Sequence, residues 1–253
     1  MAKKQKTALV TGGAKRIGAA ISEDLAANGF NVAFQYTSSE KAAQEQVDRF
    51  KGFGVNAAAF EADLTEIPAC KQLFEDASNA LGTIDLLVNN ASVFEPDSVE
   101  EFHEDAWDNH FALHVKAPAA LSSAMAYQHD LESGLILNMI DQRVLRLNPN
   151  FFSYTLSKST LWTATRTMAQ SLAPRIRVNA IGPGPTLQNA RQTPEDFQKQ
   201  IDGLILKRGP ELREFGQTIR HLYDTPSITG QLFALDGGQH LAWETPDIAG
   251  IDE

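Results

Sequence analysis

A tyrosine and a lysine four positions apart are the side chains of this sequence most suited to proton transfer. They stand in Tyr154-Thr-Leu-Ser-Lys158, and on a helix this spacing puts the phenol and the ammonium group on one face. A phenol with a pKa of about 10 is a poor acid at neutral pH unless a nearby cation helps it to release its proton. Lys158 would give that help, although Tyr/Lys pairs of this spacing also occur on ordinary helix surfaces.

A glycine-rich turn near the start of the sequence predicts a dinucleotide site. Residues 7–18 read TALVTGGAKRIG, a short apolar run followed by a turn and then by helical periodicity. Such a turn presents free backbone N–H groups and the positive end of a helix dipole to a diphosphate. Gly12 and Gly13 permit the turn, and Gly18 lets the helix approach it closely.

The end of the next apolar run bears on the choice between NAD and NADP. An enzyme that prefers NAD usually has a carboxylate there to bind ribose hydroxyls, but the sequence after Phe34 is Gln-Tyr-Thr-Ser-Ser. Hydroxyl groups and cations stand nearby instead, contributed by Thr37, Ser38, Ser39, Lys15 and Arg16. They suit a 2′-phosphate, and we predict NADPH/NADP as the cofactor. The alternative is that they are ordinary surface residues at the start of a helix.

Seven apolar, β-branched runs alternate with stretches of helical period and length. This alternation predicts an α/β fold, a single Rossmann-type, doubly wound parallel sheet of about seven strands with helices on both faces. We expect residues 1–253 to form one NAD(P)-binding domain with a substrate loop at about 183–207 and an acidic C-terminal tail at about 244–253. The runs predicted as strands are 8–11, 31–34, 55–60, 84–88, 135–140, 176–180 and 231–235.

The composition of the sequence disfavours some classes of binding partner. The 253 residues carry a net charge of −10, which disfavours a nucleic-acid partner. No stretch approaches the roughly 18 uninterrupted apolar residues of a membrane span, and the single cysteine, Cys70, excludes an intrachain disulfide. These features predict a cytoplasmic protein with a small-molecule substrate.

Five further motifs follow the glycine-rich turn in an order that resembles the short-chain dehydrogenase/reductase superfamily. They are Asn89-Asn-Ala-Ser92, Tyr154-x3-Lys158, Pro183-Gly184, Ile228-Thr-Gly-Gln231 and Asp236-Gly-Gly238. The resemblance implies a Rossmann fold, an assembly as a homotetramer or homodimer, Asp63 beside the adenine, and Asn89 supporting the cofactor. The cofactor contacts that it implies are Gly12, Arg16, Ile17, Gly18, Tyr36, Thr37, Ser38, Ser39, Asp63, Leu64, Asn89, Ala91, Ser92, Tyr154, Lys158, Pro183, Gly184 and Thr186.

Three departures from the usual family pattern resemble one branch, the pteridine reductases and the related dihydromonapterin reductases. Arg16 replaces a glycine of the turn, Ser92 replaces a glycine in NNAG, and Asp141 stands where most members have serine. Members of this branch reduce pterin rings with NADPH. The resemblance implies that Phe94 stacks on the pterin and that the substrate-binding residues are Arg16, Ser92, Phe94, Asp141 and Tyr154.

The carboxylate of Asp141 also bears on the type of reaction that the site could catalyse. A carboxylate would repel the alkoxide that forms when a ketone is reduced, whereas a serine hydroxyl would stabilise it. Reducing a C=N bond requires a hydride to carbon and a proton to nitrogen, and Asp141, Tyr154 and Lys158 could form a relay for that proton. The alternative is a surface carboxylate that pairs with Arg143 or Arg146.

His114 occupies the place of a catalytic asparagine in the resembled family. It could organise a water molecule in a proton path and so be catalytic, or it could be a core histidine satisfied by the backbone. His110 and His114 are four positions apart, but neither a glutamate in the HExxH position nor a third ligand accompanies them. We therefore predict no metal site.

The hypothesis favoured by these patterns is an enzyme, an NADPH-dependent reductase of a pterin-type ring such as a dihydropterin or dihydrofolate. Two alternatives stay open. One is a short-chain reductase of another carbonyl or imine substrate, and the other is an NADP-binding sensor without useful turnover.

Overall fold

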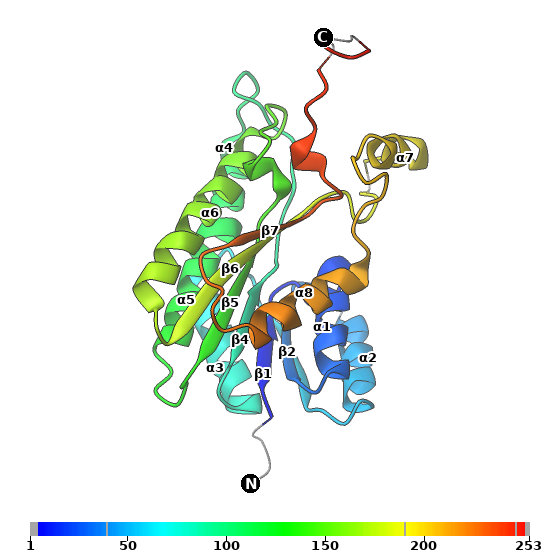
Figure 1. Cartoon of the computed structure of the whole chain (residues 1–253). Helices are drawn as coiled ribbons and strands as arrows, with labels where there is room; N and C mark the ends of the chain where they lie inside the picture. Colours follow the sequence, from blue (N-terminus) through cyan, green and yellow to red (C-terminus); the bar gives the residue numbers. More distant parts are fainter. Residues whose placement is uncertain (1–4, 39, 190, 246, 251–253) are drawn as a thin grey trace.

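A parallel sheet of seven strands forms the centre of the molecule (Figure 1). The computed structural model describes residues 5–38, 40–189, 191–245 and 247–250. The strand order is β3-β2-β1-β4-β5-β6-β7, and every pairing is parallel. The sheet confirms the predicted Rossmann-type α/β fold. The strands are β1 (Thr7–Val10), β2 (Asn31–Tyr36), β3 (Ala57–Glu61), β4 (Leu86–Asn89), β5 (Gly134–Met139), β6 (Ile176–Pro183) and β7 (Leu232–Leu235).

Helices cover both faces of the sheet (Figure 1). On one face lie α1 (Arg16–Ala27), α2 (Glu40–Lys51) and α8 (Leu212–Asp224). On the other lie α3 (Ile67–Leu81), α5 (Ala117–Ala126) and α6 (Phe152–Leu172). Shorter elements complete the chain: α4 (Glu104–Phe111), a π-helical turn η1 (Ala112–Lys116), α7 (Pro194–Asp202), and the 3₁₀ turns η2 (Gln142–Val144) and η3 (Gln239–Leu241). Among the described helices, none combines the length and the apolar character needed to cross a membrane.

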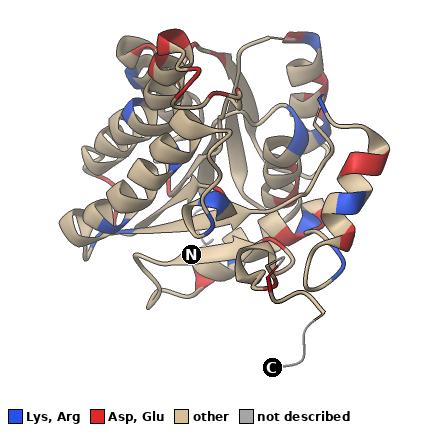
Figure 2. Cartoon of the chain, turned by 90° about the horizontal axis from the view of Figure 1, so that it is seen from above, with Lys and Arg blue, Asp and Glu red and all other residues tan. Residues whose placement is uncertain are grey.

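Alternating side chains of the strands supply two hydrophobic cores. Val10 and Val88 point into the core beneath α1, α2 and α8, whereas Leu9 and Leu87 point into the core beneath α3 and α5. The central strands are therefore apolar on both faces, as expected for a buried parallel sheet. Figure 2 shows the corresponding charge distribution, with charged residues mainly on the surrounding helices and loops.

The strand order creates a crevice at the carboxyl-terminal edge of the sheet. β1 lies between β2 and β4, so the chain leaves β1 and β4 toward opposite sides, and ligands of such sheets bind at this switch point. Four predicted features follow strand ends here: the glycine-rich turn after β1, Ser92 after β4, Asp141 after β5 and Gly184 after β6. The topology thus gathers segments that are far apart in the sequence.

Candidate active site

The glycine-rich turn after β1 is built for close backbone approach. Gly12 has a φ of +60°, and a Cβ atom on Gly18 would lie 2.1 Å from the carbonyl oxygen of Gly12. The Gly12 amide donates to the Gln35 side chain at 2.8 Å, and the Asn90 side chain donates to the Thr11 carbonyl at 2.9 Å. Glycine is required at both positions, because a side chain would strain the turn or collide with it.

A cleft of about 380 Å³ lies beside this turn, over the ends of β1, β2 and β3. Its only described carboxylate is Asp63, whose pKa is held low by hydrogen bonds from Thr65. Lys15 is the cation among the described lining residues. Eight of the predicted cofactor residues line this cleft: Gly12, Tyr36, Thr37, Ser38, Asp63, Leu64, Ala91 and Ser92. Ser39, also predicted here, lies outside the described residues.

A second cleft, of about 320 Å³, adjoins the first, and Ser92 lines both clefts. It lies between the ends of β4, β5 and β6 and the substrate loop. The predicted residues that line it are Arg16, Ile17, Ser92, Phe94, Asp141, Tyr154, Lys158, Pro183, Gly184 and Thr186. Nearly all of the predicted site residues are thus brought to two adjoining clefts.

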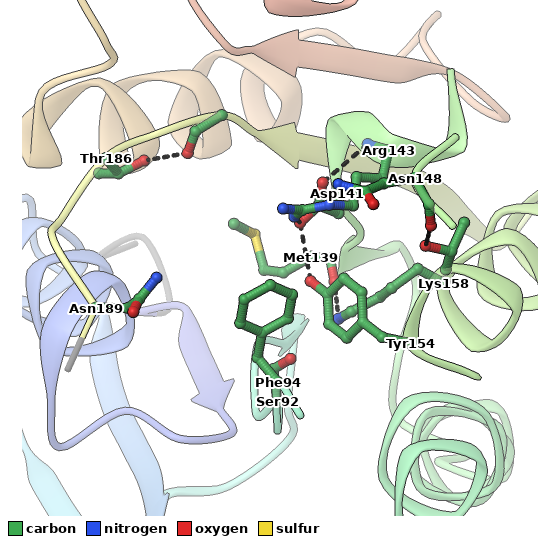
Figure 3. Close-up of polar contacts among 12 residues, drawn as sticks. Ser92, Phe94, Met139, Asp141, Arg143, Asn148, Tyr154, Lys158, Thr186 and Asn189 are labelled. Carbon is green, nitrogen blue, oxygen red and sulfur yellow. Dashed lines mark hydrogen bonds and ion pairs between the residues drawn. The ribbon is translucent and has the colours of Figure 1, made fainter. Parts of the chain in front are cut away.

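Asp141 joins Tyr154 to Arg143 at the centre of the second cleft (Figure 3). The Tyr154 hydroxyl donates to Asp141 Oδ2 at 2.9 Å, and Arg143 Nη1 lies 3.1 Å from the same oxygen. The Arg143 amide donates to Asp141 Oδ1 at 2.8 Å and fixes the carboxylate at the start of the turn η2. Asp141 thus contacts both Tyr154, its partner in the proposed proton relay, and Arg143, its ionic partner in the alternative. Arg146 instead donates to the Gln239 carbonyl.

Burial shifts the pKa values of Tyr154 and Lys158 in opposite directions. It raises the pKa of Tyr154 well above its ordinary value, and the Asp141 charge raises it further. Burial lowers the pKa of Lys158 to about 8, although Asp141 partly opposes this shift. Lys158 Nζ donates to the Met139 carbonyl at 2.9 Å and lies 5.7 Å from the centre of the Tyr154 ring. The phenol is thus held as a proton donor, because its anion is disfavoured.

Phe94 forms an aromatic wall of the second cleft (Figure 3). Its ring stacks on Phe151 with centroids 4.3 Å apart and meets the Tyr154 ring edge-on at 4.7 Å. The guanidinium groups of Arg143 and Arg191 lie 5.0 and 5.2 Å from its centroid, and Arg191 also donates to the Phe94 carbonyl. Phe151 covers one face of Phe94, so a flat ligand would have to use the opposite face.

Arg16 lies away from the cleft in which a 2′-phosphate was expected to meet it. Its φ of +51° lies in the left-handed region, which favours glycine. The side chain donates to the carbonyls of Leu187 and Gln188 in the substrate loop, at 3.1 and 3.2 Å. Lys15 lines the first cleft and Arg16 lines the second, where Arg16 was also expected as a substrate contact. Its contact with a 2′-phosphate stays a prediction.

Asn89 is directed into the core, and its neighbour Asn90 contacts the glycine-rich turn. The Asn89 amide donates to the Asn138 side chain at 2.8 Å, and Asn89 is not among the described lining residues of either cleft. Asn90 donates to the carbonyls of Thr11 and Gly12. Successive side chains at a strand end point to opposite sides, and the sequence pattern alone did not distinguish which of the two faces the turn.

His114 is buried with both ring nitrogens bonded. Its Nδ1 lies 2.8 Å from Ser157 Oγ, while its Nε2 lies 2.9 Å from Ser92 Oγ and accepts from the Val93 amide at 3.3 Å. Burial lowers its pKa well below the ordinary value. His114 is thus buried and hydrogen-bonded, mainly to serine hydroxyls, and the Ser92 contact links it to both clefts. A part in a proton path stays a prediction. Among the described residues, no cluster of three side chains could hold a metal ion.

A family model described as short chain dehydrogenase matches residues 6–199. The chain belongs to the short-chain dehydrogenase family. A 3-oxoacyl-[acyl-carrier-protein] reductase FabG of Staphylococcus epidermidis is 29% identical to it over 242 residues, covering 93% of this chain and 99% of the relative. This membership confirms the resemblance read from the motifs and makes the chain an oxidoreductase.

Two solved structures resemble nearly the whole chain in fold. FolM Alternative dihydrofolate reductase 1 from Brucella suis, in complex with NADP, is 54% identical, with a TM-score of 0.93 over 96% of this chain and 98% of that one. A blue fluorescent protein from a metagenomic library, in complex with NADPH, is 32% identical, with a TM-score of 0.87 over 92% and 97%. The first similarity fits the pteridine reductase branch indicated by the departures at Arg16, Ser92 and Asp141.

As a short-chain dehydrogenase, the chain has supporting residues that its motifs did not reveal. Gln35 and Asn90 hold the glycine-rich turn, Arg143 pairs with Asp141, and His110 stacks on His114. The contacts of Gln35 and Asn90 are tertiary, so no local spacing indicates them. Arg143 and His110 stand two and four positions from their partners. The basic residue two positions after Asp141 was the signal for the ion pair that forms.

Proposed function

We propose that this short-chain dehydrogenase is an NADPH-dependent reductase of a pterin-type ring, either a dihydropterin or dihydrofolate. The observation that carries the proposal is the hydrogen bond between Tyr154 and Asp141 in the second cleft. The similarity to a structure named as an alternative dihydrofolate reductase in complex with NADP supports it. The FabG relatives favour a carbonyl substrate instead, but a carboxylate at position 141 opposes the negative charge that carbonyl reduction develops on oxygen.

The first cleft fits the adenosine end of NADP. The turn at Gly12 offers backbone N–H groups to a diphosphate, and Lys15, Thr37 and Ser38 provide a cation and hydroxyl groups in the same cleft. β2 ends without the carboxylate that would bind the ribose of NAD. These residues are chemically matched to a phosphorylated ribose.

We expect NADPH to bind at least about tenfold more tightly than NADH, since one charge-assisted hydrogen bond contributes roughly 1.5–3 kcal/mol. Lys15→Ala should remove most of this difference, because Lys15 lines the first cleft. Arg16→Ala is the matched control: its guanidinium contacts the substrate loop, so the ratio of the two dissociation constants should persist. Fluorescence titration of both nucleotides measures that ratio. Equal affinities in the unmodified protein would contradict the charge argument.

The second cleft can deliver a proton to a ring nitrogen. When bound, NADPH supplies the hydride that adds to the neighbouring ring carbon. The Tyr154–Asp141 pair holds the acidic proton in its 2.9 Å hydrogen bond, and Arg143 holds the carboxylate in place from the other side. Donation from this pair leaves a negative charge that Lys158 and Arg143 stabilise. Phe94 provides an aromatic surface on which a flat ring can stack.

Parallel assays distinguish this proposal from its alternatives. The disappearance of NADPH absorbance is followed with a dihydropterin, with dihydrofolate, with a simple ketone and with a 3-oxoacyl thioester. We expect oxidation with at least one of the first two and little with the others. Turnover with the ketone or the thioester alone would replace the proposal by carbonyl reduction. Tight NADPH binding without turnover of any of the four would favour a sensor.

A further inference from the structure

Two buried histidines connect the loop that carries Phe94 to the helix that carries Tyr154. His110, in α4, and His114, in the turn η1, stack on each other with centroids 5.5 Å apart. His110 Nδ1 lies 2.7 Å from Ser153 Oγ and His114 Nδ1 lies 2.8 Å from Ser157 Oγ. Both serines belong to α6, and all four residues are at most 1% exposed. The same histidine–serine contact is therefore made twice, one helical turn apart.

The other nitrogen of each histidine binds the loop on either side of Phe94. His110 Nε2 accepts from the Glu95 amide and His114 Nε2 from the Val93 amide, each at 3.3 Å. A backbone N–H can only donate, so both Nε2 atoms are unprotonated, and each neutral ring carries its proton on Nδ1 and donates it to a serine. The tautomer thus follows from the hydrogen bonds themselves.

The surroundings favour this neutral form. Burial lowers the pKa of both rings, and Lys158 lowers both further, whereas Asp97 and Glu95 oppose the shift at His110. The Tyr154 ring meets both imidazoles edge-on, at 5.7 and 5.4 Å. A proton on Nε2 of either histidine would face a backbone N–H, and the bond to the loop would be lost.

We propose that His110, through Ser153 and the Glu95 amide, is a positioning residue that holds Phe94 against α6 for substrate binding. The inference rests on the proposed function, since it takes Phe94 as a wall of the pterin site. It assigns a task to a residue that lies outside both clefts. His114 anchors the loop at Val93, before Phe94, and His110 anchors it at Glu95, after Phe94. Both anchors are needed to fix the aromatic ring between them.

Two substitutions distinguish the hydrogen bonds of His110 from the packing of its ring. Glutamine places an oxygen near the position of Nε2 and can still accept from Glu95, whereas asparagine places an amide near Nδ1 and can still donate to Ser153. We expect His110→Asn to raise the KM of the dihydropterin about tenfold, the effect of one lost hydrogen bond, with NADPH affinity unchanged. His110→Gln should keep the KM within about twofold of the unmodified enzyme. Ser153→Ala loses the same contact to α6 as His110→Gln does, so it should likewise keep the KM within about twofold.

The pH dependence gives a second readout. In the unmodified enzyme the dihydropterin KM should rise on the acid side, as His110 takes up a proton and releases Glu95, and His110→Gln should weaken this rise. Equal KM values for the glutamine and asparagine variants, or equal losses in both substrate and NADPH affinity, would overturn the inference. Absence of dihydropterin turnover in the unmodified enzyme would instead refute the proposed function. The Tm of each variant identifies one that has not folded, in which case the pH profile of the unmodified enzyme decides, and a dihydropterin KM that does not rise toward acid pH would overturn the inference.

Discussion

Tyr154→Phe is expected to lower kcat for dihydropterin reduction by about 10²–10⁴-fold, the usual contribution of a general acid. The phenol is held protonated by burial and by Asp141, and its hydroxyl is directed at the carboxylate. Phenylalanine keeps the edge-on contacts of the ring with Phe94 and His114. The substitution therefore removes the proton donor with little change in the shape of the cleft.

NADPH binding should survive in this variant, because the first cleft does not include Tyr154 among its described residues. Steady-state turnover and NADPH titration measure the two effects separately. Tyr223→Phe provides a matched control. Tyr223 packs on Phe30 at the core beneath α1, α2 and α8, so this substitution should leave kcat unchanged. If Tyr154→Phe retained full turnover, Asp141 would be the direct donor and the role of the tyrosine would be wrong.

The fold was predictable from sequence because its signals are local. Buried parallel strands are continuous apolar runs, and all seven runs became strands within a few residues of the expected bounds. The glycine-rich turn was also predictable, since Gly12 and Gly18 are needed for reasons that act within the turn itself. The order of the motifs then placed them at one edge of the sheet, because parallel strands end on the same side.

The directions of individual side chains were not predictable in this way. Arg16 was recognised as an unusual cation, but its partners are Leu187 and Gln188, far along the chain. Asn89 was expected to support the cofactor, but its side chain bonds to Asn138 in the core, while Asn90 bonds to the glycine-rich turn. The sequence showed only that His110 stands four positions before His114. Its hydrogen bond with Ser153 of α6 depends on the packing of two helices and could not be predicted from that spacing. Sequence patterns identified the chemistry of the site, and tertiary contacts decided which atoms meet.

Asp141→Asn tests the carboxylate on which the proposed reduction of a pterin ring depends. We expect dihydropterin turnover to fall about 100-fold, because the amide cannot share an acidic proton with Tyr154 as a carboxylate does. The Asp141 charge contributes to the raised pKa of Tyr154, so that pKa should fall in the variant. In the unmodified enzyme the phenol stays protonated to beyond its ordinary pKa of about 10. The alkaline limb of the pH–rate profile should therefore move to lower pH in the asparagine variant.

Arg143→Gln tests whether the charge of Asp141 itself or its ion pair with Arg143 is needed for turnover. It breaks the same contact with Arg143 but leaves the carboxylate beside Tyr154, so it should preserve more turnover than Asp141→Asn and should not move the alkaline limb downward. Arg143 lowers the pKa of Tyr154, and its loss should raise that pKa instead. Opposite movements of the limb in the two variants would show that the carboxylate governs the proton. Equal rates and equal profiles would mean that Asp141 serves only to hold Arg143, and the case for C=N reduction would lose its main chemical support.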